Sequence, residues 1–238
     1  MTYPKRFDGR KINETREIEA KAGVIKRADG SAMFRIGKTL AYAAVYGPRN
    51  LHPRFLQNPR EGILRVNYTM MPFSSKGERV RPGPSRRSKE ISLVTANALL
   101  PVLNLEEFPN SVVDVFIELP QTDAGTRCAG ICAASMALAD AGIPMKDLVA
   151  AISVGRVDEQ VLVDLNYDEE AFDGKVADVP MAVVQRSGGI SLLQADGEID
   201  KDQLIKGLKL GQETLKKIFD IQKKALKEKY HMENGDEE

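Results

Sequence analysis

The first half of the chain consists mainly of short segments in which apolar and polar residues alternate. Alternation with a period of two is typical of strands that are buried on one face only. The pattern predicts strands within residues 16–25, 27–36, 39–48 and 62–73. In the last of these segments, one face carries Leu64, Val66, Tyr68 and Met70. A half-buried sheet is therefore expected in this part of the fold.

Three segments have the properties of helices. Residues 87–102 place apolar side chains at helical spacing and end near Pro101. Residues 126–142 consist almost wholly of small residues and are closed by Gly142, which suits the position just after a helix. Because this segment has no polar face, we expect it to be buried between layers. A long helix at 201–230 ends the fold.

The second half repeats the order of the first, with strands that precede a long helix. A strand is predicted at 111–120. Apolar runs then predict two hairpins, formed by 149–157 with 160–166 and by 178–185 with 190–195. Two sets of hairpins, each followed by a long helix, predict an internal duplication within one α+β domain. No linker divides the chain, so we expect a single domain over 1–232 and an acidic flexible tail at 233–238.

Composition narrows the class of protein. The chain has 238 residues, 42% of them hydrophobic, which is enough for one sizeable core or two fused smaller ones. Its 34 basic and 34 acidic side chains cancel, so a nucleic-acid site must be a local patch. The sequence has no apolar run long enough to cross a bilayer and no secretory leader, which favours a soluble, cytoplasmic protein without membrane contact.

The few cysteines and histidines disfavour two kinds of chemistry. Cys128 and Cys132 are four residues apart on a predicted helix, but no neighbouring His or third Cys completes a metal site. We therefore interpret both as small buried residues. The only histidines are His52 and His231, and the second lies in the polar C-terminal segment. A Ser-His or Cys-His hydrolase is thus disfavoured.

The junction between a predicted strand and the small-residue helix has the chemistry of an anion site. Gly125, Thr126 and Arg127 combine unpaired N–H groups at a helix N-terminus with a hydroxyl and a guanidinium. The same residues also suit an ordinary helix start, with Gly in the turn, Thr as the cap and Arg in solvent. From the residues alone, both interpretations stand.

Two further clusters carry charge. Arg86 and Arg87 begin a predicted helix, where positive charge opposes the helix dipole and a phosphate ligand would favour them. An acidic run covers 164–178, and we expect most of its carboxylates to face solvent in a loop. Asp178 is the exception, because it enters an apolar strand where an unexplained carboxylate is costly. It therefore suits a proton donor or a metal ligand.

Five motifs in a fixed order make the chain similar to a known superfamily. They are RFDGRK at 6–11, PGPSRR at 82–87, QTDAGTR at 121–127, ALADAGIPMKDLVAA at 137–151, and VLVDLN followed by ADVPMAVV from 161 onward. Together they resemble the RNase PH superfamily, and most closely the catalytic RNase PH-like subunits of archaeal exosomes. The similarity extends from about residue 4 to the end of the last helix.

This resemblance implies a fold and an activity. The fold is RNase PH-like, and the activity is a phosphate-dependent 3′→5′ exoribonuclease that releases nucleoside diphosphates and can run in reverse to add 3′ tails. Inorganic phosphate would be the co-substrate and the nucleophile. The positions that match the phosphate site are Gly125, Thr126, Arg127 and Arg87. The positions that match a grip on the RNA backbone near its 3′ end are Arg54 and Arg86.

The resemblance also implies two catalytic acids six residues apart, the second immediately before a Val-Pro strand. Asp178 fills the second place, but Phe172 stands six positions before it, so the chain carries a short insertion here. The first acid is then Asp173 or Glu170. We favour Asp173, because a short loop at Gly174 can bring it close to Asp178. If ionised, Asp173 and Asp178 could also hold Mg²⁺.

Partners are implied in the same way. The resemblance predicts a hexameric ring of three heterodimers, formed with a related inactive RNase PH-like subunit and joined by RNA-binding cap subunits. One alternative is a chemically silent ring subunit that only holds RNA, and another is a homohexamer that trims transfer RNA. The phosphate-site residues together with Asp178 disfavour the silent subunit. The basic loop at 76–87 and the ADVPMA motif disfavour the homohexamer.

Overall fold

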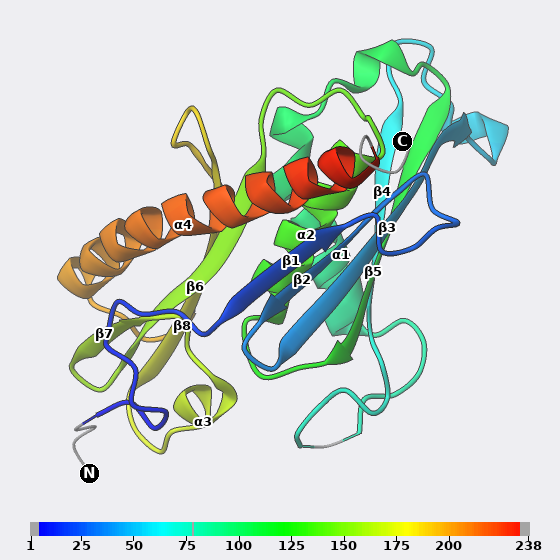
Figure 1. Cartoon of the computed structure of the whole chain (residues 1–238). Helices are drawn as coiled ribbons and strands as arrows, with labels where there is room; N and C mark the ends of the chain where they lie inside the picture. Colours follow the sequence, from blue (N-terminus) through cyan, green and yellow to red (C-terminus); the bar gives the residue numbers. More distant parts are fainter. Residues whose placement is uncertain (1–4, 78, 234–238) are drawn as a thin grey trace.

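Two sheets and four helices make up the computed structural model, which describes residues 5–77 and 79–233 (Figure 1). The first sheet has the strand order β1-β2-β3-β5-β4, in which β4 runs parallel to β5 and the other neighbours are antiparallel. Its strands are β1 (Ile18–Ala22), β2 (Gly30–Ile36), β3 (Thr39–Asn50), β4 (Ile63–Met70) and β5 (Ser111–Gln121).

The second sheet is built around a fully buried central strand. Its order is β10-β8-β6-β7, with β9 also paired to β8. The strands are β6 (Val149–Val157), β7 (Gln160–Val163), β8 (Val176–Val184), β9 (Ile190–Leu193) and β10 (Asp196–Gly197). Every residue of β6 is buried, because two helices pack against this strand. The two predicted hairpins, β6–β7 and β8–β9, are confirmed.

The helices join the two sheets into one hydrophobic core. They are α1 (Arg86–Leu99), α2 (Thr126–Asp140), α3 (Tyr167–Glu170) and α4 (Lys201–Glu233), with 3₁₀ turns η1 (Arg54–Leu56), η2 (Leu100–Val102) and η3 (Leu105–Glu107). Helix α2 contacts strands of both sheets, and α4 crosses β6 and β1 (Figure 1). The predicted α+β fold class is confirmed. Within the residues described, no helix is both long and apolar enough to cross a lipid bilayer.

The predicted division of the chain is left open by this architecture. Apolar side chains from both sheets contribute to one continuous cluster. Residues 234–238 of the predicted tail lie outside the described residues. The single domain over 1–232 and the tail at 233–238 therefore stay predictions.

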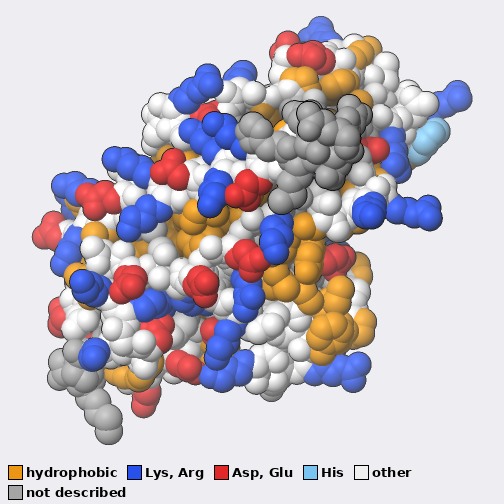
Figure 2. Space-filling model, in the orientation of Figure 1, with side chains coloured by type: hydrophobic (Ala, Val, Ile, Leu, Met, Phe, Trp, Pro, Cys, Tyr) orange, Lys and Arg blue, Asp and Glu red, His pale blue; other side chains and the backbone are white. Residues whose placement is uncertain are grey.

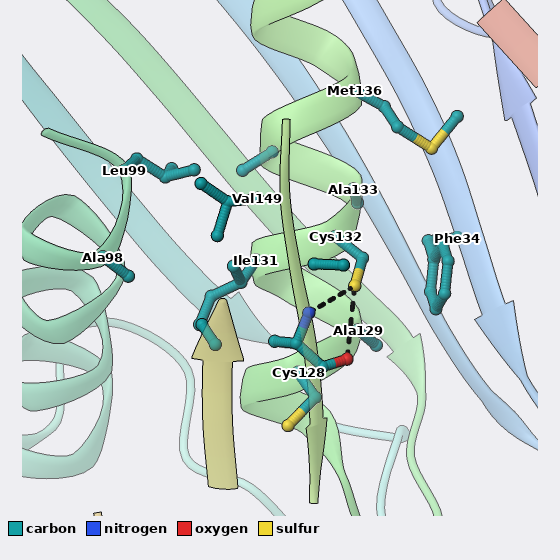
Figure 3. Packing of buried hydrophobic residues seen from close by; sticks show 14 of the residues in the cluster. Phe34, Ala98, Leu99, Cys128, Ala129, Ile131, Cys132, Ala133, Met136 and Val149 are labelled. Carbon is teal, nitrogen blue, oxygen red and sulfur yellow. Dashed lines mark hydrogen bonds between the residues drawn. The ribbon is translucent and has the colours of Figure 1, made fainter. Parts of the chain in front are cut away.

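The small residues of α2 allow it to pack closely against both sheets. Only Arg127 and Ala139 of this helix are not buried, so the predicted burial between layers is confirmed. A Cβ on Gly30 of β2 would lie 2.2 Å from the backbone nitrogen of Ala141, so this approach requires glycine. Figure 3 shows α2 side chains against Phe34 of β2, Leu99 of α1 and Val149 of β6.

Both cysteines lie in this core, as predicted. The Cys132 thiol donates to the carbonyl of Ala151 over 3.4 Å and accepts from its N–H over 3.2 Å (Figure 3). Burial raises the pKa of the Cys132 thiol to about 12 and raises the pKa of Cys128 well above its ordinary value. The thiols therefore stay protonated and fill space between layers.

The acidic run before β8 differs from the prediction of a mainly solvent-exposed loop. Asp164 and Glu169 are only 1% and 0% exposed, and residues 167–170 form the short helix α3. Asn166 and Glu169 make a capping box, in which each side chain accepts a hydrogen bond from the other residue's backbone N–H. Buried carboxylates require buried cations, which here come from arginines of the N-terminal segment.

Candidate active site

A pocket of about 490 Å³ opens where the first turn of α2 faces the start of β8 and the end of α3. Residues of both sheets and of the first turn of α1 contribute to its walls. The polar and charged part of the lining includes Arg87, Gly125, Thr126, Arg127, Ser153, Glu170, Asp178 and Asp196. The predicted phosphate-site residues are thus brought together with Asp178, across a boundary between the two sheets.

The turn that leads into α2 is held in a left-handed conformation that leaves the helix N-terminus without a side-chain cap. Ala124 and Gly125 have φ angles of 57° and 64°, in the left-handed region that turns the chain sharply from β5 into the helix. The Thr39 hydroxyl donates to the Ala124 carbonyl over 2.7 Å and accepts from the Asp123 N–H over 2.9 Å. Gly125 has no side chain that could cap α2, so the first N–H groups of the helix are available to an anion.

Two arginines from different helices add positive charge to this wall. Nη2 of Arg127 lies 3.3 Å from a carboxylate oxygen of Glu90 on α1. Nε of Arg127 is buried and has no hydrogen-bond partner among the described residues. Arg87, in the first turn of α1, lines the same pocket. Because a buried donor without a partner is costly, an anion in the pocket would satisfy Arg127.

Two carboxyls form the opposite wall. Asp178 of β8 accepts a hydrogen bond from the Ser153 hydroxyl, and burial raises the pKa of Asp178 above its ordinary value. Burial also raises the pKa of Glu170 to about 7, with a further contribution from the negative charge of Asp178. A carboxyl with this pKa can hold a proton at neutral pH and still release it. Glu170 is therefore a candidate general acid.

The structure places Asp173 outside this pocket. Its side chain is exposed in the loop between α3 and β8. This loop packs on the turn between β6 and β7, where the Asp158 N–H donates to the Lys175 carbonyl over 2.8 Å. Phe172 packs against a small hydrophobic cluster of the second sheet. The structure therefore favours Glu170, our alternative, over the Asp173 that we predicted as the first acid.

The two arginines predicted to grip RNA do not line the pocket. Arg54 lies in η1, just after β3, and in the pairing of β3 with β5 Asn50 stands opposite Ser111. The pocket lies beyond Gln121, at the other end of β5, about 33 Å away at roughly 3.3 Å per residue. Arg86 is exposed at the first position of α1. We call residues 124–127 the phosphate turn. Within one subunit, Arg54 and the phosphate turn cannot contact the same nucleotide.

The carboxyl pair is also the pocket's candidate cation site. Among residues 5–77 and 79–233, no group of three or more His, Cys, Asp or Glu side chains is placed to hold a metal ion. Mg²⁺, however, often uses one or two carboxylates together with substrate phosphates. Glu170 and Asp178 line the same pocket, and the negative charge of Asp178 contributes to the raised pKa of Glu170, so these two carboxyls are the candidate ligands. The exposed Asp173 is not part of it.

Fold and pocket together define a class of enzyme. The protein is an α+β enzyme whose pocket places a helix N-terminus and two arginines opposite two carboxyls of raised pKa. Such a pocket suits group transfer between two anions. The phosphate needs fixed positive charge and oriented N–H donors, and the leaving oxygen needs a proton.

Comparison with known proteins identifies the family. Residues 14–144 match domain 1 of the 3′ exoribonuclease (RNase PH) family and residues 147–214 match its domain 2, so the chain belongs to this family. The exosome complex component Rrp41 of Thermococcus gammatolerans is 53% identical over 226 residues, which cover 95% of this chain and 90% of that protein.

Two solved structures have the same fold. The crystal structure of rice Rrp46 superposes with a TM-score of 0.80 at 25% identity, covering 93% of this chain and 100% of that one. A structure of the Archaeoglobus fulgidus exosome with RNA bound to the active site gives a TM-score of 0.76 at 22% identity, covering 90% and 91%.

The predicted superfamily and activity are confirmed by these similarities. The chain is a phosphorolytic 3′→5′ exoribonuclease with an RNase PH-like fold. Enzymes of its family use inorganic phosphate as co-substrate. Family membership does not test the roles of individual pocket residues, so these stay predictions.

Proposed function

We propose that the chain is the RNA-degrading subunit of an exosome, and that it removes nucleotides from RNA 3′ ends and can add them in reverse. One observation carries the proposal: a single pocket holds the phosphate turn, two arginines and two carboxyls of raised pKa. A silent ring subunit would have no use for a carboxyl whose pKa is near 7. Similar proteins named as exosome components support the assembly.

Inorganic phosphate binds in this proposal at the first turn of α2. The N–H groups after Gly125 and the Thr126 hydroxyl donate to its oxygens, while Arg127 and Arg87 neutralise its charge. The buried Nε of Arg127 then gains the partner that it lacks in the protein alone. Because Thr39 already holds the turn in place, these donors need not rearrange when the ligand binds.

The chemical step is an in-line displacement at phosphorus. A phosphate oxygen forms a bond to the phosphorus of the last phosphodiester, and the bond from that phosphorus to the preceding 3′ oxygen breaks. The products are a nucleoside diphosphate and an RNA that is one nucleotide shorter. Since both reactants are anions, the fixed charges of Arg87 and Arg127 lower the cost of their approach.

Glu170 supplies the proton that the leaving 3′ oxygen needs. Burial and the neighbouring Asp178 raise the pKa of Glu170 to about 7, so a substantial fraction of its carboxyls is protonated near neutral pH, and a bound phosphate anion would raise the pKa further. In the reverse reaction, the same carboxylate takes the proton from the 3′ hydroxyl. Asp178, hydrogen bonded to Ser153, is the second acid, and Asp173 has no role in this arrangement.

Mg²⁺, where it binds, would be held by Glu170 and Asp178 and would stabilise negative charge on the transferred phosphoryl group. Only an ionised carboxylate makes a good ligand, so Glu170 holds either a proton or the ion. The raised pKa of Glu170 makes the proton the stronger competitor below neutral pH.

RNA upstream of its last nucleotide is proposed to run past Arg86 and Arg54. Arg86 is next to Arg87 and is exposed beside the pocket, so it can contact a phosphate close to the 3′ end. Arg54 lies at the far end of the first sheet. It would therefore contact a more distant part of a longer RNA instead of the terminal nucleotide.

The first sheet has an open face that suits a partner subunit. Tyr46 and Phe116 meet on this face with ring centroids 5.9 Å apart, and Phe116 is 38% exposed. Figure 2 shows hydrophobic side chains gathered on this side of the molecule. We propose that a related inactive RNase PH-like subunit covers the face in a hexameric ring of three heterodimers. RNA-binding cap subunits would complete the assembly in the cytoplasm.

The test is an assay of oligo(A) degradation by the chain with and without the related subunit, and with and without phosphate. The proposal requires phosphate-dependent release of nucleoside diphosphates and extension of an oligo(A) primer by excess ADP. Nucleoside monophosphates formed without phosphate would overturn it. Native mass distinguishes the remaining alternative, because a fully active homohexamer would indicate an enzyme that trims transfer RNA.

A further inference from the structure

We propose that Arg16 is a positioning residue that holds the phosphate turn and the acid-bearing helix α3 at a fixed separation. The proposal rests on the roles assigned to the phosphate turn and to Glu170. Arg16 lies just before β1, and its side chain is only 7% exposed. It touches neither bound phosphate nor RNA in the proposed reaction, so any effect on the reaction acts through its neighbours.

One side of the Arg16 guanidinium is bound to Asp164, in the segment that leads into α3. Nε and Nη2 donate to the two carboxylate oxygens of Asp164 over 3.0 and 2.6 Å, and the Arg16 backbone N–H donates to the same carboxylate over 2.7 Å. Asp164 is 1% exposed, and its own N–H donates to the Ser153 carbonyl over 2.8 Å. Because Asp164 leads directly into α3, this contact sets where Glu170 stands.

The other side of the guanidinium is bound to Asp123, the residue that precedes the phosphate turn. Nη1 donates to the backbone carbonyl of Asp123, the residue before the left-handed turn. A Cβ added to Gly125 would lie 3.2 Å from Nη2, so the guanidinium lies directly against the turn. The Asp123 carboxylate accepts in addition from the N–H of Tyr167, the first residue of α3, over 3.2 Å.

Arginine is suited to this position by its geometry. The guanidinium offers five N–H donors in a rigid plane, so it can bind a carboxylate with two donors and a carbonyl with a third. The two groups that it joins are Asp123, within the residues that match domain 1 of the family, and Asp164, within those that match domain 2. A lysine could keep the charge but could not hold both groups in one plane.

Arg6 provides a matched control. It also forms a buried ion pair, donating from Nε and Nη2 to the Glu169 carboxylate over 2.8 Å each. Its other donors bind backbone carbonyls, among them those of Val163 and Asp164 over 2.9 and 2.7 Å. Arg6 thus stabilises the same helix, but its hydrogen bonds do not reach the phosphate turn.

The experiment compares Arg16→Lys with Arg6→Lys in the assembled enzyme under saturating RNA and phosphate. Displacing a catalytic group by about 1 Å can cost on the order of 100-fold in rate. We therefore expect Arg16→Lys to lower the single-turnover rate per folded molecule by about 10- to 100-fold, while KM for phosphate changes little. Arg6→Lys should lower thermal stability similarly, but its rate should fall clearly less, because Arg6 holds α3 without binding the phosphate turn.

A double variant separates a positioning role from a merely structural one. If Arg16 acts through Glu170, then Arg16→Lys should slow a Glu170→Gln enzyme little further. An unchanged rate in Arg16→Lys, or losses that multiply in the double variant, would overturn the proposal. Failure of the unsubstituted enzyme to need phosphate would instead refute the proposed function, so the two failures can be told apart.

Discussion

The two walls of the active-site pocket are built in different ways. The basic wall is built mainly on one continuous stretch, from Ala124 to Arg127, whose left-handed turn and free helix N-terminus are properties of the local backbone, and α1 adds Arg87 to it. The acidic wall combines Glu170 of α3 with Asp178 of β8, and its chemistry depends on burial and on charges from other elements. A wall formed by one stretch of backbone can be predicted from the local sequence. The altered pKa values of the acidic wall cannot, because they depend on residues elsewhere in the chain.

The largest expected effect concerns which residue of the acidic wall is the general acid. Glu170→Gln should lower the single-turnover rate by about 10²- to 10⁴-fold, the usual contribution of a general acid, while RNA still binds. Asp173→Asn is the matched control and should leave the rate close to that of the unchanged enzyme, since Asp173 is exposed outside the pocket. An inactive Asp173→Asn beside an active Glu170→Gln would contradict the placement of the acid.

The next effect concerns the basic wall. Arg127→Met removes a donor aimed at the attacking phosphate, so kcat/KM for phosphate should fall by about 10²- to 10³-fold. Arg127→Lys keeps the charge without the fork and should lose less. RNA affinity measured without phosphate should persist in both variants. Loss of RNA binding that matches the loss of rate would show that Arg127 serves the RNA and not the phosphate.

The pH dependence tests the acidic wall in a second way. With the pKa of Glu170 near 7, the saturated rate should fall about tenfold per pH unit once the carboxyl has lost its proton. Bound phosphate should place this fall at or above pH 7, because nearby negative charge disfavours ionisation. The slow residual rate of Glu170→Gln should lack this fall at alkaline pH. A rate profile with the same alkaline fall in both proteins would assign the ionisation to another group.

Glu170 should make stability depend on pH in the opposite sense to a carboxylate that is paired with a cation. The pKa of Glu170 is raised from 4.5 to about 7 in the folded protein, so the folded state holds a proton that the unfolded chain has released. The free energy of unfolding should therefore fall as pH rises through that window, by on the order of 1–3 kcal/mol. Glu170→Gln should be relatively more stable at pH 8 than at pH 4, as measured by Tm.

The smallest effect is expected far from both walls. Arg54→Ala should weaken the binding of long RNA severalfold and lower the slope of log affinity against log salt by about one. The single-turnover rate at saturating RNA should stay unchanged, because Arg54 lies at the other end of the first sheet. An unchanged salt slope would remove Arg54 from the proposed RNA path.

Several features followed from the sequence alone. The uniform small residues of α2 required a helix buried on all sides, and the structure has one between the two sheets. The apolar run at 149–157 and the turn after it predicted the β6–β7 hairpin with the observed bounds of β6, although β7 ends at Val163 and not at residue 166. The Gly-Thr-Arg junction could be recognised because a strand end, a turn and a helix start are all local signals.

The acidic residues show what local signals cannot predict. The capping box of Asn166 and Glu169 is a local pattern that could have predicted α3, and with it a different position for the first acid. The burial of Asp164 and Glu169, in contrast, depends on Arg16 and Arg6, which lie 148 and 163 residues away in the chain. No spacing within the acidic run reveals that its carboxylates are paired.

By itself, then, the sequence determined most of the elements, the family and the turn at Gly125, because each is recognised from short stretches of neighbouring residues. Only the tertiary structure decided that Glu170 and not Asp173 lines the pocket with Asp178, and that Arg54 and the phosphate turn lie toward opposite ends of β5. The physical reason is that a carboxyl acquires a raised pKa from lost hydration and nearby charge. Both are properties of a place in the fold, which distant segments create together.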